Sequence, residues 1–384
     1  MGSLCLCAAR VTFVGQIIRV PGKGINGMNM VLHLAGDKTA HGKIFVMSAG
    51  QFCAGIVGGG DFFRIGADFR LVHYGFNRHT LLLNMKSPLL FQNQPAFQLI
   101  EGSDQVIVAP ERGARVLQWI REGREIITWP ADADWARILK VRGGNPVLFP
   151  FVARHFVDGK NELWRDRDGT VRPMSQHGFA RDAKFSVIDG EEQALRMRLV
   201  DSEETRACYP FAFQFDVVVS VLPTSRLEIR FETTNTGNTS LPYYAGHHFY
   251  FTLPHRERAD WTLQLPCASW GRQTSDGSII HEKAKEDLLH LDDPALVDRF
   301  QIHPRDAITL LNTKTQQRLV FELTHPGSVP WYAVTTWTQA TDSDFYCIEP
   351  WLGLPNAIHH GEGLRYLEPG RTEVATCVLD GSGW

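Results

Sequence analysis

A carboxylate and two adjacent histidines lie in two aromatic-rich stretches that are far apart in this sequence. Residues 345–356 read FYCIEPWLGLPN, so Glu349 follows a run of β-forming residues and precedes Pro350, which cannot donate to a sheet ladder. We therefore expect a strand that Pro350 ends, with Glu349 held at its end among aromatic side chains. A poorly solvated, fixed carboxylate has a raised pKa and suits general base catalysis, whereas a strand-end glutamate facing water would have no such role.

The second stretch, residues 243–254, reads YYAGHHFYFTLP and contains His247 and His248. Neighbouring residues of a strand point to opposite faces, so these two imidazoles cannot share one task. We expect one of them to face a cleft and the other to face the protein interior or solvent. An imidazole can serve as general acid opposite a carboxylate base, although a single histidine is more often structural.

The composition restricts the class of protein. The chain has 384 residues, of which 43% are hydrophobic and 21% charged, with a net charge of −3. This is an ordinary soluble composition; the near-neutral charge argues against a nucleic-acid partner, and no apolar run is long enough to span a membrane. Seven cysteines without regular spacing predict no disulfide framework and favour a reduced, cytoplasmic protein. No cluster has metal-site spacing, so no metal is expected.

The first 84 residues differ from the rest. They hold 14 of the 34 glycines, one of the 20 prolines, none of the ten tryptophans and no glutamate. Such a shift marks a boundary, and Met85 resembles a natural start. We expect residues 1–84 to be an N-terminal extension without a stable fold, before a domain over 85–384; a small accessory domain is the alternative.

After Met85 the sequence predicts one strand after another. Residues 227–232 alternate apolar and charged side chains, as in a sheet with one buried face. Helical patterns are scarce, and residues 132–139 form at best a short helix. Further strands are expected over residues 105–109, 116–120, 125–129, 213–221, 226–233, 261–265, 318–324, 331–337 and 373–379. The predicted fold is therefore all-β, a large antiparallel β-sandwich.

Together, the histidine and glutamate stretches resemble the aldose 1-epimerase (mutarotase) family. In that family an H-x-[YF]-F-x-L strand supplies the general acid, and an I-E-P-W-x-G strand end supplies the general base. The resemblance implies that His248 is the acid and Glu349 the base. It also implies a galactose mutarotase-like supersandwich with the sugar site on its concave face.

Two more segments extend the resemblance, which covers roughly residues 88–380. Residues 144–154, GNPVLFPFVAR, resemble the family's G-x-P-x-L-x-P-x-x-x-R loop, and residues 176–181, QHGFAR, resemble its H-G-F-x-R segment. The resemblance implies that Arg154 and His177 bind sugar hydroxyls. Taken singly, Arg154 would be read as part of a surface ion pair and His177 as a hydrogen-bonded histidine in a turn. The order of all four motifs favours the functional roles.

Three features depart from the family pattern. Phe249 stands after the histidine where proline is common, and Arg371 replaces the glutamate of the final turn. The family also places an aspartate on the substrate between the His and Glu strands. Four aspartates lie in this interval without a decisive motif: Asp260, Asp276, Asp293 and Asp298.

The resemblance implies an isomerase that interconverts the α and β anomers of a hexose without a cofactor, as a monomer or homodimer. Trp351 would offer an apolar face to the sugar. Two alternatives stay open, a hexose-6-phosphate 1-epimerase and a non-catalytic carbohydrate-binding sandwich. Arg181 and His155 would suit a phosphate, unless Asp182 and Asp158 pair with them.

We predict that a shortened chain beginning at Met85 is soluble and as active as the full chain, because the family-like part lies after that residue. Circular dichroism and sugar turnover check this. Loss of folding on truncation, or a protease-resistant fragment that includes residues 1–84, would contradict it.

Overall fold

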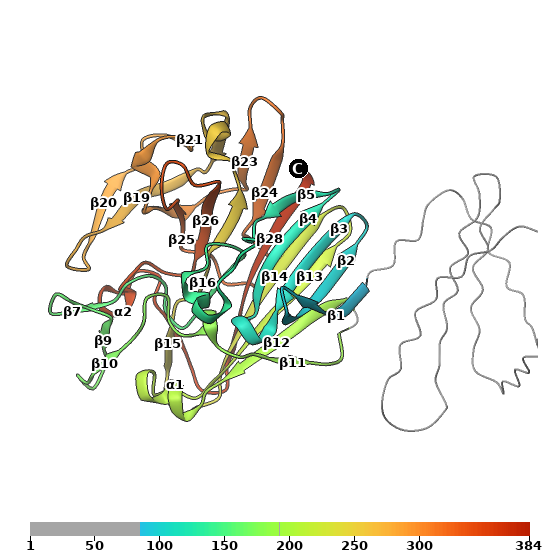
Figure 1. The fold of residues 1–384 in the computed structure, drawn as a ribbon. Helices are drawn as coiled ribbons and strands as arrows, with labels where there is room; N and C mark the ends of the chain where they lie inside the picture. The colour runs from blue at the N-terminus through green and yellow to red at the C-terminus, as the bar shows by residue number, and fades with distance from the viewer. Residues whose placement is uncertain (1–84, 192) are drawn as a thin grey trace, which may run out of the picture. The chain divides into compact units, whose positions relative to one another are not determined.

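The computed structural model describes residues 85–191 and 193–384, and there the chain forms two large antiparallel sheets (Figure 1). The all-β sandwich prediction is confirmed. The expected extension, residues 1–84, lies outside the described residues. No helix in the described ranges is long and apolar enough to cross a membrane.

The first sheet carries the two histidines and Glu349. Its main path runs, in spatial order, through β1 (Met85–Phe91), β2 (Gln94–Glu101), β3 (Asp104–Ala109), β4 (Arg115–Arg121), β5 (Arg124–Ile127), β17 (Phe249–Thr252), β26 (Phe345–Trp351), β25 (Ala333–Trp337), β22 (Arg299–Pro304), β19 (Cys267–Gln273) and β20 (Ile279–Lys283). The short strands β6 (Val147–Leu148) and β16 (Gly246–His247) attach to this path beside β26.

The second sheet packs against the first. Its order is β11 (Ser186–Ile188), β12 (Ala194–Val200), β13 (Phe213–Leu222), β14 (Arg226–Asn235), β28 (Thr372–Gly383), β24 (Arg318–Glu322), β23 (Ile308–Asn312), β18 (Trp261–Gln264) and β21 (Leu288–His290). Small two-stranded sheets join β7 (Phe156–Val157) to β8 (Lys160–Asn161), β9 (Leu163–Arg165) to β10 (Val171–Pro173), and β15 (Leu241–Tyr243) to β27 (Arg365–Leu367). The α-helices are α1 (Glu203–Cys208) and α2 (Ala357–His360), and the helix expected over 132–139 is a 3-10 helix, η2 (Trp135–Lys140).

An aromatic core joins the inner faces of the two sheets. Phe149 stacks on Phe215 with ring centroids 4.2 Å apart, and Phe231 lies 4.3 Å from the ring of His247. In β14 the apolar residues of the alternating segment are buried, while Arg230 and Glu232 form an outward ion pair at 2.8 Å. The period-two pattern thus assigns one face of β14 to the core, and burial of that face supplies most of the driving force for packing.

The sequence predicted that Pro350 ends this strand, but β26 continues to Trp351. Where β26 pairs with β16, Leu352 donates its backbone N–H to the carbonyl of Ala245. Backbone N–H groups two residues apart point to the same side of a strand, so an N–H at position 350 would point to His247. Pro350 has no N–H to donate there. The carbonyl of His247 accepts the indole N–H of Trp351 at 3.2 Å instead, and β25 pairs along the other side of the strand.

The two Gly-containing segments of the sequence are hydrogen-bonded to each other. Phe179 and Ala180 donate their N–H groups to the carbonyl of Phe149, and His177 donates to that of Ala153. Gly178 makes this contact possible: its φ is +72°, and a Cβ there would lie 2.1 Å from the Phe149 oxygen. Backbone packing thus fixes where His177 can lie.

We therefore predict that Gly178→Ala destabilises the fold more than Gly169→Ala does. Both glycines have positive φ, but nothing lies within 4 Å of a Cβ at Gly169. The control substitution should cost about 1 kcal/mol of backbone strain, and Gly178→Ala at least about 2 kcal/mol, because it adds a steric clash. Urea unfolding measures both; equal losses would show that the close approach at Gly178 is not a constraint.

Candidate active site

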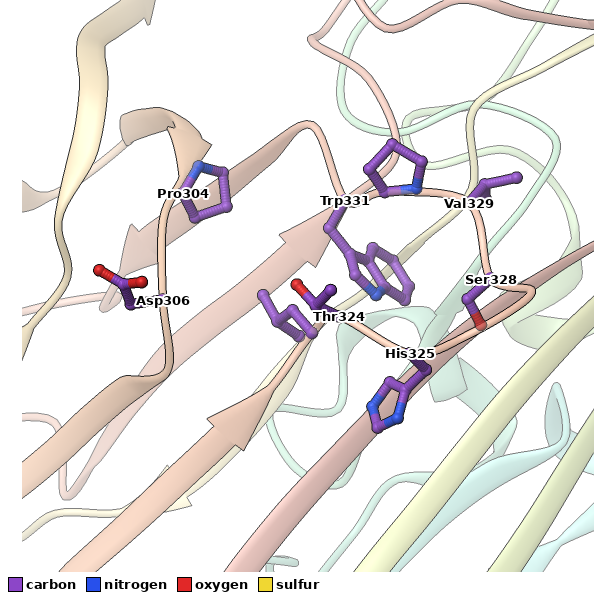
Figure 2. Close-up of a pocket in the computed structure, with 9 residues that line it drawn as sticks. Pro304, Asp306, Thr324, His325, Ser328, Val329 and Trp331 are labelled. Carbon is purple, nitrogen blue, oxygen red and sulfur yellow. The ribbon is translucent and has the colours of Figure 1, made fainter.

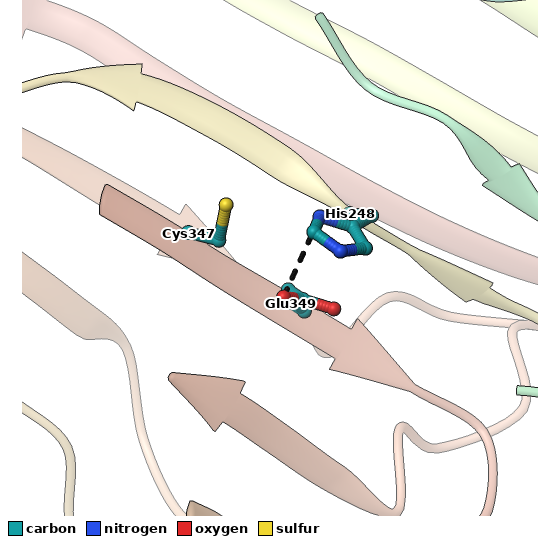
Figure 3. A group of neighbouring side chains, drawn as sticks. All are labelled: His248, Cys347 and Glu349. Carbon is teal, nitrogen blue, oxygen red and sulfur yellow. Dashed lines mark ion pairs between the residues drawn. The ribbon is translucent and has the colours of Figure 1, made fainter. Parts of the chain in front are cut away.

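His248 and Glu349 face each other across two neighbouring strands. The register pairs Gly246 with Trp351 and Phe249 with Ile348, which puts His248 directly opposite Glu349. Since residues 245 and 352 form a hydrogen-bonded pair, the 248–349 pair is of the non-hydrogen-bonded kind, in which side chains approach most closely. Nδ1 of His248 lies 3.5 Å from Oε1 of Glu349 (Figure 3), and the two residues are 9% and 1% exposed.

His247 points the opposite way, as predicted for its place beside His248. Its ring packs in the core between the sheets, 4.8 Å from Phe249 and 5.1 Å from Trp331. The ring of His248 instead stacks on Tyr250 at 4.8 Å and lies 5.8 Å from Trp337. Only His248 is therefore placed beside the carboxylate.

A single amide positions both histidines. Asn145 is 1% exposed; its Oδ1 accepts the backbone N–H of His248 at 2.9 Å, and its Nδ2 lies 3.0 Å from Nδ1 of His247. Asn145 belongs to the 144–154 motif, but no sequence pattern assigns it this function. The two histidines that it contacts lie far from it in the sequence, so only the folded structure reveals the contact.

His177 lies beside the pair, with its ring 5.5 Å from that of His248. Its Nδ1 accepts the N–H of Ala153 at 3.0 Å, so a neutral His177 carries its hydrogen on Nε2, which lies 3.3 Å from the side-chain amide of Gln176. Arg154 is exposed, and its charge acts on Asp298, which in turn acts on Glu349. Of the four aspartates left open by the sequence, the structure thus connects Asp298 to the site.

Trp351, which was expected to offer an apolar face to the sugar, is 3% exposed, and its indole N–H is bonded to the carbonyl of His247. The half-buried Trp337, near His248, is the better-placed aromatic face.

Burial favours the neutral forms of both members of the pair. Loss of solvent raises the pKa of Glu349 well above its ordinary value, and the nearby Asp298 adds to this. Loss of solvent, together with the charges of Arg181, Arg115 and Arg142, lowers the pKa of His248 to about 3. Both shifts favour a protonated carboxyl group at Glu349 and a neutral imidazole at His248.

These three arginines form a cationic cluster at the site. Arg115 is 1% exposed, its Nε and Nη1 have no hydrogen-bond partner, and burial lowers its pKa to about 10. Arg181 also has an unpartnered, buried Nε. Arg142 donates to Gln339 at 3.0 Å and lies 5.3 Å over the ring of Trp337. Arg115 and Arg142 carried no motif signal that would have identified them.

His155 does not add positive charge, contrary to the expectation from the sequence. It is fully buried, and burial lowers its pKa to about 3. Its Nε2 lies 2.7 Å from the hydroxyl of Tyr244, and Asp158 pairs with Arg165 instead. His155 is a neutral core histidine.

A separate pocket of about 110 Å³ is lined by Pro304, Asp306, Leu323, Thr324, His325, Ser328, Val329, Pro330 and Trp331 (Figure 2). Two of its polar side chains bond to the protein itself: Ser328 donates to the hydroxyl of Thr376 at 2.7 Å, and Trp331 donates to the Thr376 carbonyl at 2.8 Å. It is also smaller than ordinary small-molecule sites of about 300–1,000 Å³. We do not place the chemistry there.

Comparison with known proteins assigns the family. The family model described as aldose 1-epimerase matches residues 95–380, so the chain belongs to the aldose 1-epimerase family, whose members are isomerases. The chromosomal protein LacX of Lactococcus lactis subsp. lactis is 24% identical over 265 residues, which cover 63% of this chain and 82% of LacX. A putative glucose-6-phosphate 1-epimerase of Cenchrus ciliaris is 26% identical over 259 residues, or 62% and 72% of the two chains.

Solved structures share the fold. The Slr1438 protein from Synechocystis sp. PCC 6803 has a TM-score of 0.65 at 24% identity, covering 79% of this chain and 98% of that one. A galactose mutarotase-like protein from Clostridium acetobutylicum has a TM-score of 0.66 at 15% identity, with coverages of 77% and 98%. At these identities the likeness establishes the supersandwich architecture and nothing finer.

The buried histidines make stability depend on pH. Burial lowers the pKa of His177 well below 6.5, and those of His155, His247 and His248 to about 3. Below pH 6.5 the unfolded chain binds protons that the folded chain does not. Each histidine thus contributes stability that is complete above pH 6.5 and is lost towards pH 3, at about 1.4 kcal/mol per pH unit. Glu349 acts in the opposite sense, since its contribution is lost as pH rises above 4.5.

We predict that the free energy of unfolding falls as pH drops from 7 to 5, and that His155→Gln reduces the mean slope over this range by about 1 kcal/mol per pH unit. His290→Gln is the matched control, because His290 is exposed. Urea unfolding at several pH values measures the slope. A slope unchanged by His155→Gln would mean that His155 is not held neutral.

Proposed function

We propose that this chain catalyses the interconversion of hexose anomers, with Glu349 as general base and His248 as general acid. The observation that carries the proposal is the His248–Glu349 pair, 3.5 Å apart and placed directly across two strands. In a cyclic aldose, O1 and the ring oxygen O5 are bonded to the same carbon. An acid and a base that act on them must therefore lie side by side, as these two groups do.

The reaction needs two proton transfers. Glu349 takes the proton of the O1 hydroxyl while His248 gives a proton to O5, and the C1–O5 bond breaks. The free aldehyde turns about C1–C2, the ring closes on its other face, and the transfers reverse. The pair holds one proton throughout: the ionic form begins ring opening, and the neutral form that burial favours ends it. Each group contributes about 10²–10⁴-fold.

Other side chains support binding of the sugar. His177 offers its Nε2 hydrogen, and Arg154 and Asp298 offer charged groups to hydroxyls at the exposed side of the site. Trp337 offers an apolar face. None of these roles requires a cofactor.

A phosphorylated hexose is the second candidate, and the arginine cluster favours it. Arg115, Arg142 and Arg181 bring three positive charges close to His248, and two of them have unpartnered donors. A phosphate would accept these hydrogen bonds and offset the field that lowers the pKa of His248, which would help His248 to act as an acid. The relative from Cenchrus ciliaris, by its name, acts on glucose 6-phosphate.

Polarimetry of freshly dissolved α-glucose, α-galactose and glucose 6-phosphate distinguishes the candidates. An epimerase accelerates the approach to the equilibrium rotation, and preference for the phosphorylated sugar would assign the arginine cluster to the phosphate. A non-catalytic carbohydrate-binding sandwich would bind sugar without any acceleration, and that result would contradict the proposal.

We predict that Glu349→Gln lowers turnover by about 10²-fold or more while sugar binding largely persists, since the amide keeps the shape but cannot accept the proton. His248→Asn should behave likewise. The double variant should lose much less than the product of the two losses, because the groups act as a unit. Initial rates and calorimetric titration measure turnover and binding.

His247→Asn is the control, because this neighbouring histidine faces the core, and its substitution should affect stability more than turnover. Near wild-type turnover in a folded Glu349→Gln variant would contradict the assignment of the base.

A further inference from the structure

Cys347 lies beside the acid–base pair without a part in the proposed reaction. It precedes Glu349 by two residues on β26, so both side chains point to the same face, and both are buried. His248, Cys347 and Glu349 each have one potential ligand atom in this cluster, and these three atoms lie within 4.8 Å of one another (Figure 3). Nδ1 of His248 is buried without a hydrogen-bond partner.

Imidazole nitrogen, thiolate sulfur and carboxylate oxygen are the ligands that zinc uses in proteins. At ordinary zinc–ligand distances the ligand atoms of a tetrahedral site are about 3.3–3.6 Å apart. The His248–Glu349 separation of 3.5 Å already fits, and the thiol needs to approach by only about 1 Å, which side-chain rotation can supply. The fourth position would be left to water.

Charge balance also fits a divalent ion. A dication with the thiolate of Cys347 and the carboxylate of Glu349 has no net charge, and the buried site disfavours isolated charges. The nearby cations Arg115, Arg142 and Arg181 repel a metal ion. The site is therefore suited to reversible binding rather than to a tightly held structural ion.

We propose that His248, Cys347 and Glu349 form an inhibitory binding site for Zn²⁺ or a similar thiophilic divalent cation. Binding releases the thiol proton, and the proton held by the His248–Glu349 pair, to solvent. It engages both groups that must handle protons on O1 and O5, so metal and sugar compete. The binding site stands on geometry alone, whereas the inhibition rests on the proposed function.

In the first test, the full-length protein is treated with a chelator, and its inhibition by added Zn²⁺ is measured at several sugar concentrations. The rate of each variant is expressed relative to the rate of the same variant without metal. Chelation should not lower the rate, and zinc should inhibit competitively. Cys347→Ala should raise the inhibition constant by at least about 10-fold, since one of three ligands is lost. Cys267→Ala is the matched control: Cys267 is another buried strand cysteine, on β19, and should leave the constant unchanged.

The second test needs no turnover. Titration of the full chain with Co²⁺ should produce a near-ultraviolet thiolate-to-cobalt absorption band in the wild type and in Cys267→Ala, and none in Cys347→Ala. Cys347→Ser serves if the alanine variant does not fold. Absence of the band in the wild type, or its survival without Cys347, would overturn the proposal. A Cys347-dependent band in a protein that does not accelerate mutarotation would retain the metal site and refute the proposed function instead.

Discussion

The site depends on one feature of antiparallel pairing. His248 and Glu349 occupy a non-hydrogen-bonded position of the β16/β17–β26 ladder, so their side chains are brought together by the backbone rather than by mobile loops. Pro350 interrupts the ladder next to this position, and Trp351 restores the lost bond from its side chain. On the far side of the histidine strand, Asn145 accepts the N–H of His248. The geometry of the pair is thus fixed by bonds that involve no charge.

Burial gives the pair its chemical character. A solvated glutamate and histidine would each titrate independently, but here both are almost completely enclosed. Burial raises the pKa of Glu349 and lowers that of His248, so it favours the neutral form of each group. The same enclosure makes buried charge costly, so an anionic ligand near the arginines would offset their charge and accept from their unpartnered donors.

Local patterns predicted much of this structure. The strand alternation in residues 227–232 and the opposite orientations of His247 and His248 both follow from period-two geometry, and they are confirmed. The motif order selected His177, His248 and Glu349, which the fold brings together. The roles of these residues in turnover stay predictions.

What the sequence could not predict depends on pairing between distant segments. Four residues acquire their significance only when β4, β26 and the segment 142–154 meet: Arg115, Arg142, Asn145 and Cys347. No local periodicity encodes that meeting. Pro350 misled the strand prediction because its missing N–H matters on one side of β26 only. His155 misled the charge prediction because its burial beside Tyr244 is a tertiary property.

If Glu349 and His248 act as base and acid, the sugar's two reacting oxygens lie against the two members of this cross-strand pair. A crystal structure of the Glu349→Gln variant with a bound hexose shows where these oxygens lie. We expect O1 within hydrogen-bond distance of the residue 349 side chain and O5 within hydrogen-bond distance of His248. A sugar bound with its anomeric carbon away from this pair would show that the pair does not carry the chemistry.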